Sequence, residues 1–420
     1  MPRGRRVHSH SPVLRLARAL AAAAVFLALG RSAFAQQLIP AEPDPSVARV
    51  RIGPLWLNPA IDLTNAGVDT NVFNDPPDRH PVSDFTMTVV PKTQLWLRFG
   101  STWFSGEVDE QIVWYQKYTS ERSANSTYAL DWRIPASRFV FDVGGRYVNT
   151  RQRPGFEIDT RAQQTDTTVT GKMEIRALSK TYFGVEASRA TVDFASGETF
   201  LDLDLHDELN RVATTVGLTM RQQVTPLTAI NVDVVREEDR FDFLHERDAN
   251  TTNATVGVTF DPQALLKGSA KIGYQRFQPL DPLLPAFTGT TATVDLSYVL
   301  LGTTRFNVQA LRAVQYSYDL SEPYYLQTGV TGTVAQQIFG PIDAIVRGNL
   351  QHLAYRDRLD ESAPIENRLD TVRSYGAGLG YHIGRDLRVG VNYDFVERLS
   401  PLPDHRYSGH VIGTSATYGF

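Results

Sequence analysis

From about Gly53 to the end of the chain, apolar and polar residues alternate with a period of two in segments of about ten to fifteen residues. In Leu387–Glu397, "LRVGVNYDFVE", the odd positions carry the apolar and aromatic side chains and the even positions the polar ones. The same division occurs in 126–134, "STYALDWRI", and in 167–176, "TTVTGKMEIR". Since successive side chains of a strand point to opposite faces, these segments predict β-strands with one apolar and one polar face.

Two segments depart from this alternation. In "TYFGVEASRATVDF" the aromatic residues Tyr182, Phe183 and Phe194 do not share one parity, and in "RFNVQALRAV" Arg312 has the parity of the apolar Phe306. A bulge inserts one residue into a strand and shifts its register. We therefore expect a bulge in each of these two strands.

Short and long connections alternate along the chain, which makes about eighteen strands. The short turns lie near 100–101, 135–137, 178–180, 223–226, 262–266, 302–303, 339–341 and 384–385. The longer, mostly polar connections are 67–83, 118–123, 150–162, 195–206, 238–249, 279–287, 319–323, 356–370 and 400–406.

Strand length separates two architectures that alternation alone allows. Strands of soluble sandwiches are usually about five or six residues long, whereas these are long enough to cross a bilayer when tilted. Within hydrocarbon a sheet must close on itself to pair every backbone group. The sequence therefore predicts an all-β fold, a closed antiparallel transmembrane barrel of about 18 strands with short periplasmic turns and long extracellular loops. A soluble sandwich or propeller is the alternative, but no repeat of blade length is present.

The N-terminus has the three parts of a secretory signal peptide: an arginine-rich start, the apolar run "ALAAAAVFLAL", and Ala33-Phe34-Ala35 as a cleavage site. We expect cleavage after Ala35. The predicted organisation is a signal peptide at 1–35, a short Pro-containing periplasmic lead at 36–52 and an outer-membrane barrel at 53–420.

Composition limits the classes of partner. The chain has no cysteine, so no disulfide framework is expected, and its formal charge of −4 does not indicate a nucleic-acid partner. No motif indicates a cofactor or a metal site. The predicted partners are outer-membrane lipid and lipopolysaccharide, and the location is the outer membrane of a Gram-negative bacterium.

Charged residues occur on the polar parity of many strands. An arginine or lysine that faces lipid at the bilayer midplane costs about 2–4 kcal/mol, so this parity is expected to face water inside the barrel. A barrel of this size leaves an aqueous channel. Either these residues line a pore, or they form ion pairs that only stiffen the wall. The pore-lining candidates are Lys92, Arg98, Asp131, Arg133, Asp142, Arg146, Lys172, Glu174, Arg176, Asp233, Lys271, Asp295, Asp343, Arg347, Arg388 and Asp394.

The other polar features point less clearly to chemistry. No histidine lies in a recognisable motif with serine or aspartate, so catalysis is not expected. The carboxylates of "LDLDLHDEL" at 201–209 either hold divalent cations or are solvated loop surface. Aromatic residues near strand ends are expected at the membrane interfaces: Trp96, Trp114, Tyr118, Tyr355, Tyr381 and Tyr418.

The first long connection and its flanks, "AGVDTNVFNDPP" and "SDFTMTVVPK", resemble the beta-barrel porins of Gram-negative bacteria of the putative beta-barrel porin 2 type. The matching positions are Gly67, Asp69, Asn71, Val72, Ser83, Asp84, Phe85 and Pro91, and the shared strand pattern extends from about residue 50 to 420. The resemblance implies an outer-membrane pore. Some members are linked to exopolysaccharide export, which makes polysaccharide export proteins candidate partners.

The ending "GTSATYGF" resembles the signal that the barrel assembly machinery recognises, with Tyr418 and Phe420 as its aromatic residues. Ser415 stands where the signal usually has glycine. We expect this segment to be the closing strand, with Ile412, Ala416, Tyr418 and Phe420 facing lipid and Gly413, Ser415 and Thr417 facing the lumen.

The function expected from these features is a channel for passive passage of hydrophilic solutes, with saccharide or exopolysaccharide as candidate cargo. The first alternative is a structural or adhesion barrel whose loops occlude the lumen, and the second is an outer-membrane barrel enzyme. Channel events in planar bilayers separate the pore from the occluded barrel. Turnover that depends on a rim histidine would indicate the enzyme.

Overall fold

The computed structural model describes residues 48–261, 264–360 and 365–419 of the chain, and most of them are in β-strands. The wall is formed by β2 (Leu55–Asp69), β3 (Asp84–Phe99), β4 (Thr102–Tyr115), β5 (Ser123–Ala136), β6 (Phe139–Gln152), β7 (Ala162–Arg176), β8 (Thr181–Phe194), β11 (Arg211–Thr225) and β12 (Thr228–Phe241). It continues with β13 (Ala249–Phe260), β14 (Leu266–Pro279), β15 (Phe287–Leu300), β16 (Thr304–Tyr316), β17 (Tyr324–Phe339), β18 (Ile342–Arg356), β19 (Leu369–Ile383), β20 (Leu387–Leu399) and β21 (Tyr407–Tyr418).

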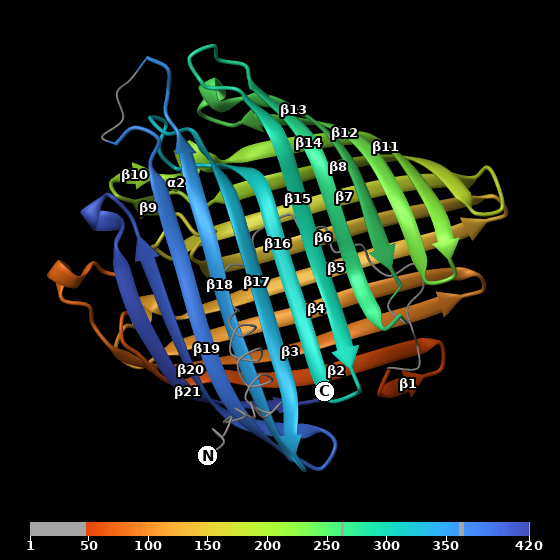
Figure 1. Ribbon diagram of the computed structural model, residues 1–420, viewed down its shortest axis with the longest axis horizontal. Helices are drawn as coiled ribbons and strands as arrows, with labels where there is room; N and C mark the ends of the chain where they lie inside the picture. Colours follow the sequence, from red (N-terminus) through yellow and green to blue (C-terminus); the bar gives the residue numbers. More distant parts are fainter. Residues whose placement is uncertain (1–47, 262–263, 361–364, 420) are drawn as a thin grey trace, which may run out of the picture.

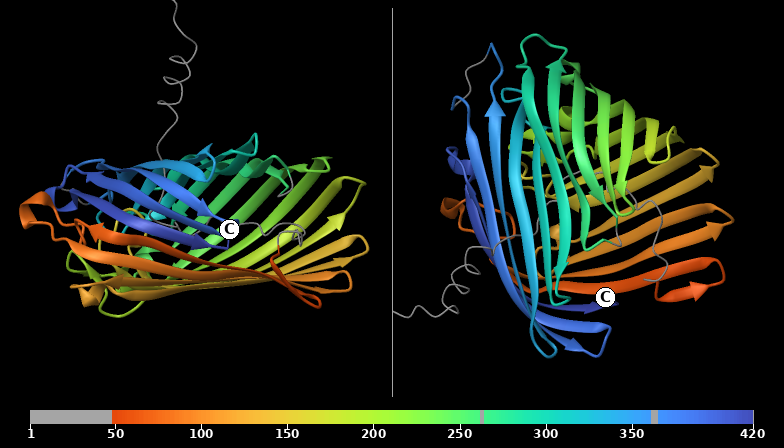
Figure 2. Two further views of the ribbon diagram at one scale, coloured as in Figure 1. Left: turned by 90° about the horizontal axis from the view of Figure 1, so that it is seen from below. Right: turned by 45° about the vertical axis from the view of Figure 1, so that its right-hand side comes forward.

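These strands form one closed antiparallel barrel. Each strand pairs with the next, and β2 pairs with β21, so the first and last strands lie side by side (Figure 1). Closure leaves no edge whose backbone groups would face lipid unpaired. The prediction of a closed antiparallel barrel of about eighteen strands is confirmed, and Figure 2 shows the continuous, tilted wall from two further directions.

The alternation of the sequence becomes the two faces of this wall. Side chains such as Leu130, Val216, Leu218 and Ile272 are 53%, 53%, 66% and 62% exposed, because they lie on the outer face that the membrane covers. The intervening positions face the interior. Within the described residues, no helix has the length and apolar character needed to cross a bilayer.

The two predicted bulges are absent. β8 pairs with β7 and β11, and β16 with β15 and β17, each without a shift in register. In β8 the mixed parity arises because Tyr182 and Phe194 face the interior: Tyr182 lies 3.9 Å under the guanidinium of Arg221, and Phe194 is buried beneath the loops. Arg312 keeps its outward parity and donates to the carbonyl of Thr290, 3.1 Å away.

One register shift lies at the closing seam; two others lie beside short turns, between Gln223 and Thr225 of β11 and between Gln337 and Phe339 of β17. The register of β2 shifts between Leu63 and Ala66, where Asn65 has φ of 54°. Immediately after it, a Cβ on Gly67 would come within 1.9 Å of the backbone oxygen of Ile412. Only glycine allows the two strands to approach this closely.

The residues of the porin-like sequence motif that follow Gly67 fix the first loop beside this seam. Asp69 accepts a hydrogen bond from the backbone N–H of Asn71, whose amide group donates to the carbonyl of Ser408, 3.0 Å away. Asp84 accepts from the backbone N–H groups of Lys117 and Tyr118 at 2.7 and 3.0 Å. The motif therefore joins the first loop to the next loop and to the last strand.

Smaller elements complete the two ends of the barrel. β1 (Val50–Ile52) pairs with the start of β2, so three residues of the expected lead extend the wall at the end of the short turns. β9 (Thr199–Phe200), β10 (Leu203–Asp204) and the short helix α2 (Leu205–Leu209) lie in one long connection at the other end (Figure 1). The predicted signal peptide and Phe420 lie outside the described residues.

Candidate channel and its extracellular mouth

All sixteen charged candidates lie on the inner face of the wall. On β18 and β20 they share the parity of Tyr355 and Arg398, which contact the loop that crosses the interior. The registers of neighbouring strands agree, for example Lys92 opposite Asp109 and Arg133 opposite Asp142. Their role as the lining of a water-filled pore stays a prediction.

Most of these residues are paired along the wall. Eleven of the sixteen form ion pairs, including Arg347 with Asp394 at 2.7 Å and Arg388 with Asp343 at 2.5 Å. The other five form no ion pair within the described part of the chain: Arg98, Asp131, Arg146, Arg176 and Asp295. We call the eleven residues the wall pairs. Each solvated ion pair contributes little to the free energy of unfolding. Together the pairs stiffen the wall and balance its charge.

The connection 153–161, between β6 and β7, crosses the extracellular mouth. β6 and β7 are the fifth and sixth wall strands, whereas the loop's partners lie on the far side, after β16 and in β20. On its own side Arg161 pairs with Glu121 at 2.5 Å, and Arg153 donates to the carbonyl of Val72 at 2.8 Å. The loop is therefore fixed at both ends and spans the barrel. We call it the crossing loop.

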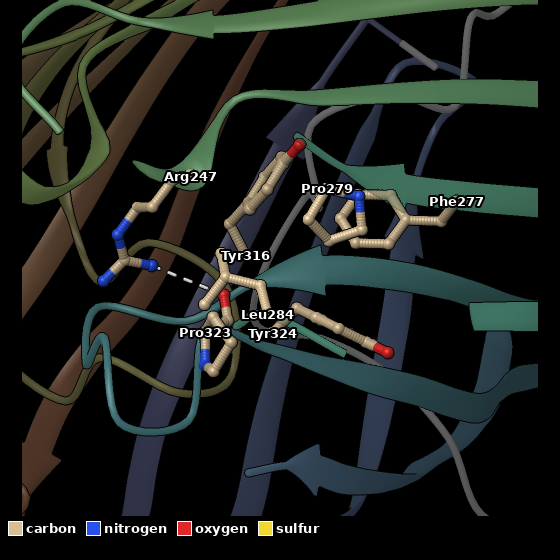
Figure 3. A pocket seen from close by; sticks show the side chains of 7 residues that line it. All are labelled: Arg247, Phe277, Pro279, Leu284, Tyr316, Pro323 and Tyr324. Atoms are coloured by element: carbon tan, nitrogen blue, oxygen red, sulfur yellow. Dashed lines mark hydrogen bonds between the residues drawn. The ribbon is translucent and has the colours of Figure 1, made fainter. Parts of the chain in front are cut away.

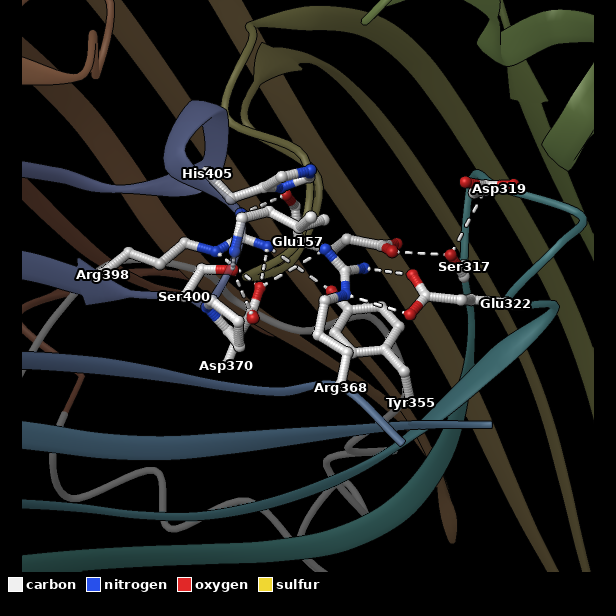
Figure 4. A network of polar contacts seen from close by, with 12 residues as sticks. Glu157, Ser317, Asp319, Glu322, Tyr355, Arg368, Asp370, Arg398, Ser400 and His405 are labelled. Carbon is white, nitrogen blue, oxygen red and sulfur yellow. Dashed lines mark hydrogen bonds and ion pairs between the residues drawn. The ribbon is translucent and has the colours of Figure 1, made fainter. Parts of the chain in front are cut away.

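Arg398 of β20 is the centre of the contacts on the far side (Figure 4). Its guanidinium donates to the carbonyl of Glu157 at 2.5 Å, to Asp159 at 2.7 Å and to Asp370 at 2.7 Å. The Arg398 side chain is fully buried. A buried charge requires this many partners, because each unmet hydrogen bond in a water-free site costs free energy.

A second arginine extends the network towards the neighbouring loop. Arg368 pairs with Glu322 at 2.6 Å, and its guanidinium lies 3.6 Å from the centre of the Tyr355 ring. Ser317 donates to Glu157 at 2.6 Å. The resulting mouth network contains Glu157, Asp159, Glu322, Tyr355, Arg368, Asp370 and Arg398.

The network holds more acidic groups than basic ones. Glu157, Asp159, Glu322 and Asp370 face only two arginines within it. Burial raises the pKa of Glu157 and that of Glu322 to about 7 each, despite the neighbouring arginines. Burial also lowers the pKa of the nearby His405 to about 3, so this imidazole stays neutral at ordinary pH. The charge of the mouth network therefore depends on pH near neutrality.

The tops of β16 and β17 bend inward and add an apolar part to the mouth. β15 pairs with β16 only from Ala292 opposite Arg312 downward. Above this point Tyr316 and Tyr324, whose parity is outward, pack on the inward-facing Phe277 with ring centres 5.9 and 5.0 Å away. Figure 3 shows the hollow between these rings. The side chains around it leave no space for a water molecule. It is lined by Arg247, Phe277, Pro279, Leu284, Tyr316, Pro323 and Tyr324.

Helix α2 packs on the crossing loop from another side. Leu205 and Leu209 are buried with Ile158 and Tyr318. Asp204 caps the helix by accepting from the backbone N–H of His206 at 3.0 Å, and Glu208 pairs with the buried Arg247 at 2.8 Å. Two of the carboxylates considered as cation ligands, those of Asp204 and Glu208, therefore have partners within the protein.

Arg247 joins this helix to the loop after β16. Its guanidinium donates to the carbonyls of Ser317 at 2.7 Å and Tyr318 at 3.1 Å. Two loops are therefore held together by one buried side chain.

Sequence reasoning missed the mouth network because the long loops were taken as solvated surface. A signal was present in the crossing loop, "RPGFEIDTR", where apolar residues alternate with acidic ones between arginines. The prediction for the interfacial aromatics requires outward side chains, which Trp114, Tyr381 and Tyr418 have, and their position at the membrane interface stays a prediction.

The same prediction is wrong for three residues. Tyr355 is fully buried in the mouth network, because its ring covers Arg368. Trp96 faces the interior opposite Trp56, and Tyr118 packs on Phe73 within the loops. Parity, rather than closeness to a strand end, decides which aromatic ring reaches the membrane.

A closed barrel with an apolar outer face, a charged inner face and loops folded over one end is an outer-membrane β-barrel of the porin class. The chain belongs to the family "Putative beta-barrel porin 2", which it matches over residues 46–420. This confirms the resemblance seen in the sequence and the location in the outer membrane.

The fold is also similar to solved porin structures at low sequence identity. OpdK from Pseudomonas aeruginosa is 10% identical with a TM-score of 0.42, over 86% of this chain and 98% of that one. A BenF-like porin from Pseudomonas fluorescens Pf-5 is 8% identical with a TM-score of 0.46, over 87% and 98%. OccK2 (OpdF) from Pseudomonas aeruginosa, solved with glucuronate, is 9% identical with a TM-score of 0.44, over 86% and 97%. No curated protein matches the chain.

Proposed function

We propose that this porin-like barrel is a gated channel for small hydrophilic solutes, which opens when the crossing loop leaves the mouth. The observation that carries the proposal is the contrast between the wall of the interior and its extracellular mouth. The wall carries charged pairs throughout its depth, a composition suited to water, whereas the crossing loop is held in the mouth by a buried network centred on Arg398.

The signs of the wall pairs are balanced, so the proposed channel favours neither cations nor anions strongly. Neutral or weakly charged solutes, including saccharides, fit such a lining. Export of exopolysaccharide would require a longer-lived open state, because the crossing loop would have to stay displaced while the polymer passes through the barrel. Small-solute passage therefore takes precedence in the proposal.

The second candidate function is a structural barrel whose mouth stays occluded. The depth of burial in the mouth network favours it: Glu157 is 2% exposed and Arg398 fully buried. The two candidates differ in one property, whether the interior conducts once the crossing loop is removed.

Swelling of proteoliposomes in solutions of neutral sugars and of charged solutes tests the proposal. The comparison uses the wild-type chain and a variant in which 154–160 is replaced by a short Gly-Ser linker. We expect slow swelling with the wild type, fast swelling with the variant, and little dependence on solute charge. A heat-modifiable band on a gel shows that both barrels are folded. A folded variant that admits no solute would support the structural barrel instead.

A further inference from the structure

Arginine side chains form a patch on the outer face of the barrel near its extracellular rim. Arg189 of β8, Arg236 of β12 and Arg276 of β14 are exposed and face away from the interior. In the register of the sheet, Arg236 lies opposite Thr252 of β13, and Thr252 lies opposite Arg276. Two strand spacings of about 4.8 Å separate the two arginines, which is within reach of two long side chains that converge on one group. We call Arg189, Arg236, Thr252 and Arg276 the rim patch.

The rim patch lies at the upper border of the apolar band. On the same strands, the outward residues one step nearer the periplasm are aliphatic or aromatic: Val234 is 47% exposed and Tyr274 is 59% exposed. Val256 and Ile272, a further step down, are 52% and 62% exposed. On the extracellular side the outward residues are polar. The rim patch is thus at the depth where acyl chains give way to headgroups.

The arginines of the rim patch have unused hydrogen-bonding capacity. Arg189 and Arg276 form no hydrogen bond or ion pair with the described residues, and Arg236 has one contact, 3.4 Å from Glu238. Glu238 is also 3.2 Å from Arg240, whose guanidinium donates in addition to Asn250 at 2.9 Å. Arg240 is therefore largely satisfied.

Among the acids around the rim patch, Glu238 contacts it, and this one carboxylate is shared between Arg236 and Arg240. Asp193, outward on β8, accepts from the Asn210 amide at 2.7 Å, and Glu246 in the loop above β12 pairs with Arg358 at 2.9 Å. The remaining nearby acid, Asp242, lies beyond the end of β12. The opposite sector differs, because Arg373 of β19 is paired with Glu397 at 2.5 Å. The arginines of the rim patch therefore differ from Arg373, since none of them has a carboxylate of its own.

We propose that the rim patch binds a phosphate group of an outer-leaflet glycolipid, whose acyl chains lie along Val234, Val256 and Tyr274. Arginine forms bidentate hydrogen bonds with phosphate, and the hydroxyl of Thr252 lies between Arg236 and Arg276 as a further donor. The apolar surface directly below selects a phosphorylated lipid over free phosphate. The site rests on the outer-membrane location and not on channel activity.

Binding of lipopolysaccharide to the purified full-length barrel in detergent tests the site. The titrations use intact lipopolysaccharide, the same material after enzymatic removal of its phosphates, and inorganic phosphate. The double variant R236Q/R276Q is expected to bind intact lipopolysaccharide about 25-fold more weakly, about fivefold for each arginine. Dephosphorylation is expected to weaken binding to the wild type by a similar factor and to leave the double variant unchanged. R373Q is the matched control and should bind as the wild type does.

Three results would overturn the proposal: equal affinity of the wild type and the double variant, equal affinity of the wild type for intact and dephosphorylated lipid, or displacement of the lipid by an equal concentration of inorganic phosphate. The last result would indicate a site for free phosphate. The single variant R276Q removes an exposed side chain without partners, so it gives the same test if the double variant does not fold.

Discussion

Replacing Arg398 with glutamine is expected to release the crossing loop. The arginine donates to the carbonyl of Glu157, to Asp159 and to Asp370 from a fully buried position, and glutamine cannot reach all three. Removing one partner of a buried charged network costs about 3–5 kcal/mol, because the remaining charges lose their counterion. Part of this cost disappears when the loop moves into water, so undocking becomes more favourable.

The size of the effect follows from the lower of these values. A change of about 3 kcal/mol alters the ratio of undocked to docked loop by a factor of about 150. If the undocked state is populated at about 0.1% in the wild type, it rises to about 13% in the variant. Single-channel recording in planar bilayers measures this directly as the fraction of time that the channel is open.

The control for this experiment is Arg373→Gln, in the neighbouring strand β19. Arg373 also pairs with a carboxylate, Glu397, but on the outer face with a half-exposed side chain, so its loss should change little. Equal open fractions for Arg398→Gln and the wild type, in barrels shown to be folded, would refute the reasoning.

Three further changes have defined outcomes. Glu157 of the crossing loop has a pKa of about 7 in the docked state and an ordinary value of 4.5, so the docked state retains a proton that the undocked state releases between these values. Docking should weaken as the pH rises from 4.5 to 7, by up to about 3 kcal/mol, and open fractions recorded across this range should rise for the wild type and stay flatter for E157Q. Gly67→Ala should destabilise the seam by about 1–3 kcal/mol, because the new Cβ meets the backbone of Ile412; an unchanged thermal midpoint would contradict this. Deleting Phe420 should reduce the amount of barrel in the outer membrane far more than it alters the conductance of assembled barrels, and normal membrane levels would count against its role as an assembly signal.

The fold was predictable because membrane and water impose the same pattern on the wall strands, with apolar side chains outward and polar side chains inward. Parity alone placed residues as far apart as Lys92 and Asp394 on the inner face, and the alternation of connections gave the number of strands. The same rule failed where the environment is neither lipid nor open water. Phe194 and Tyr355 have inward parity but are aromatic, because loops cover them. No local sequence pattern predicts which loop folds inward.

The mouth network depended on contacts between segments far apart in the chain. Arg398 and Asp159 are separated by 239 residues, and their pairing follows from the curvature of the closed barrel, which brings β7 and β20 across from each other. Alternation within a strand carries no information about such a contact. The composition of the crossing loop indicated burial, but its partners required the barrel.

The central claim is that a conducting interior lies beneath a docked loop. Conductance of the folded barrel with 154–160 replaced by a short linker, recorded in planar bilayers beside the wild type, tests it most directly. We predict long-lived steps of constant amplitude for the shortened barrel, and rare openings of the same or smaller amplitude for the wild type. A folded, membrane-inserted shortened barrel that shows no steps would contradict the account.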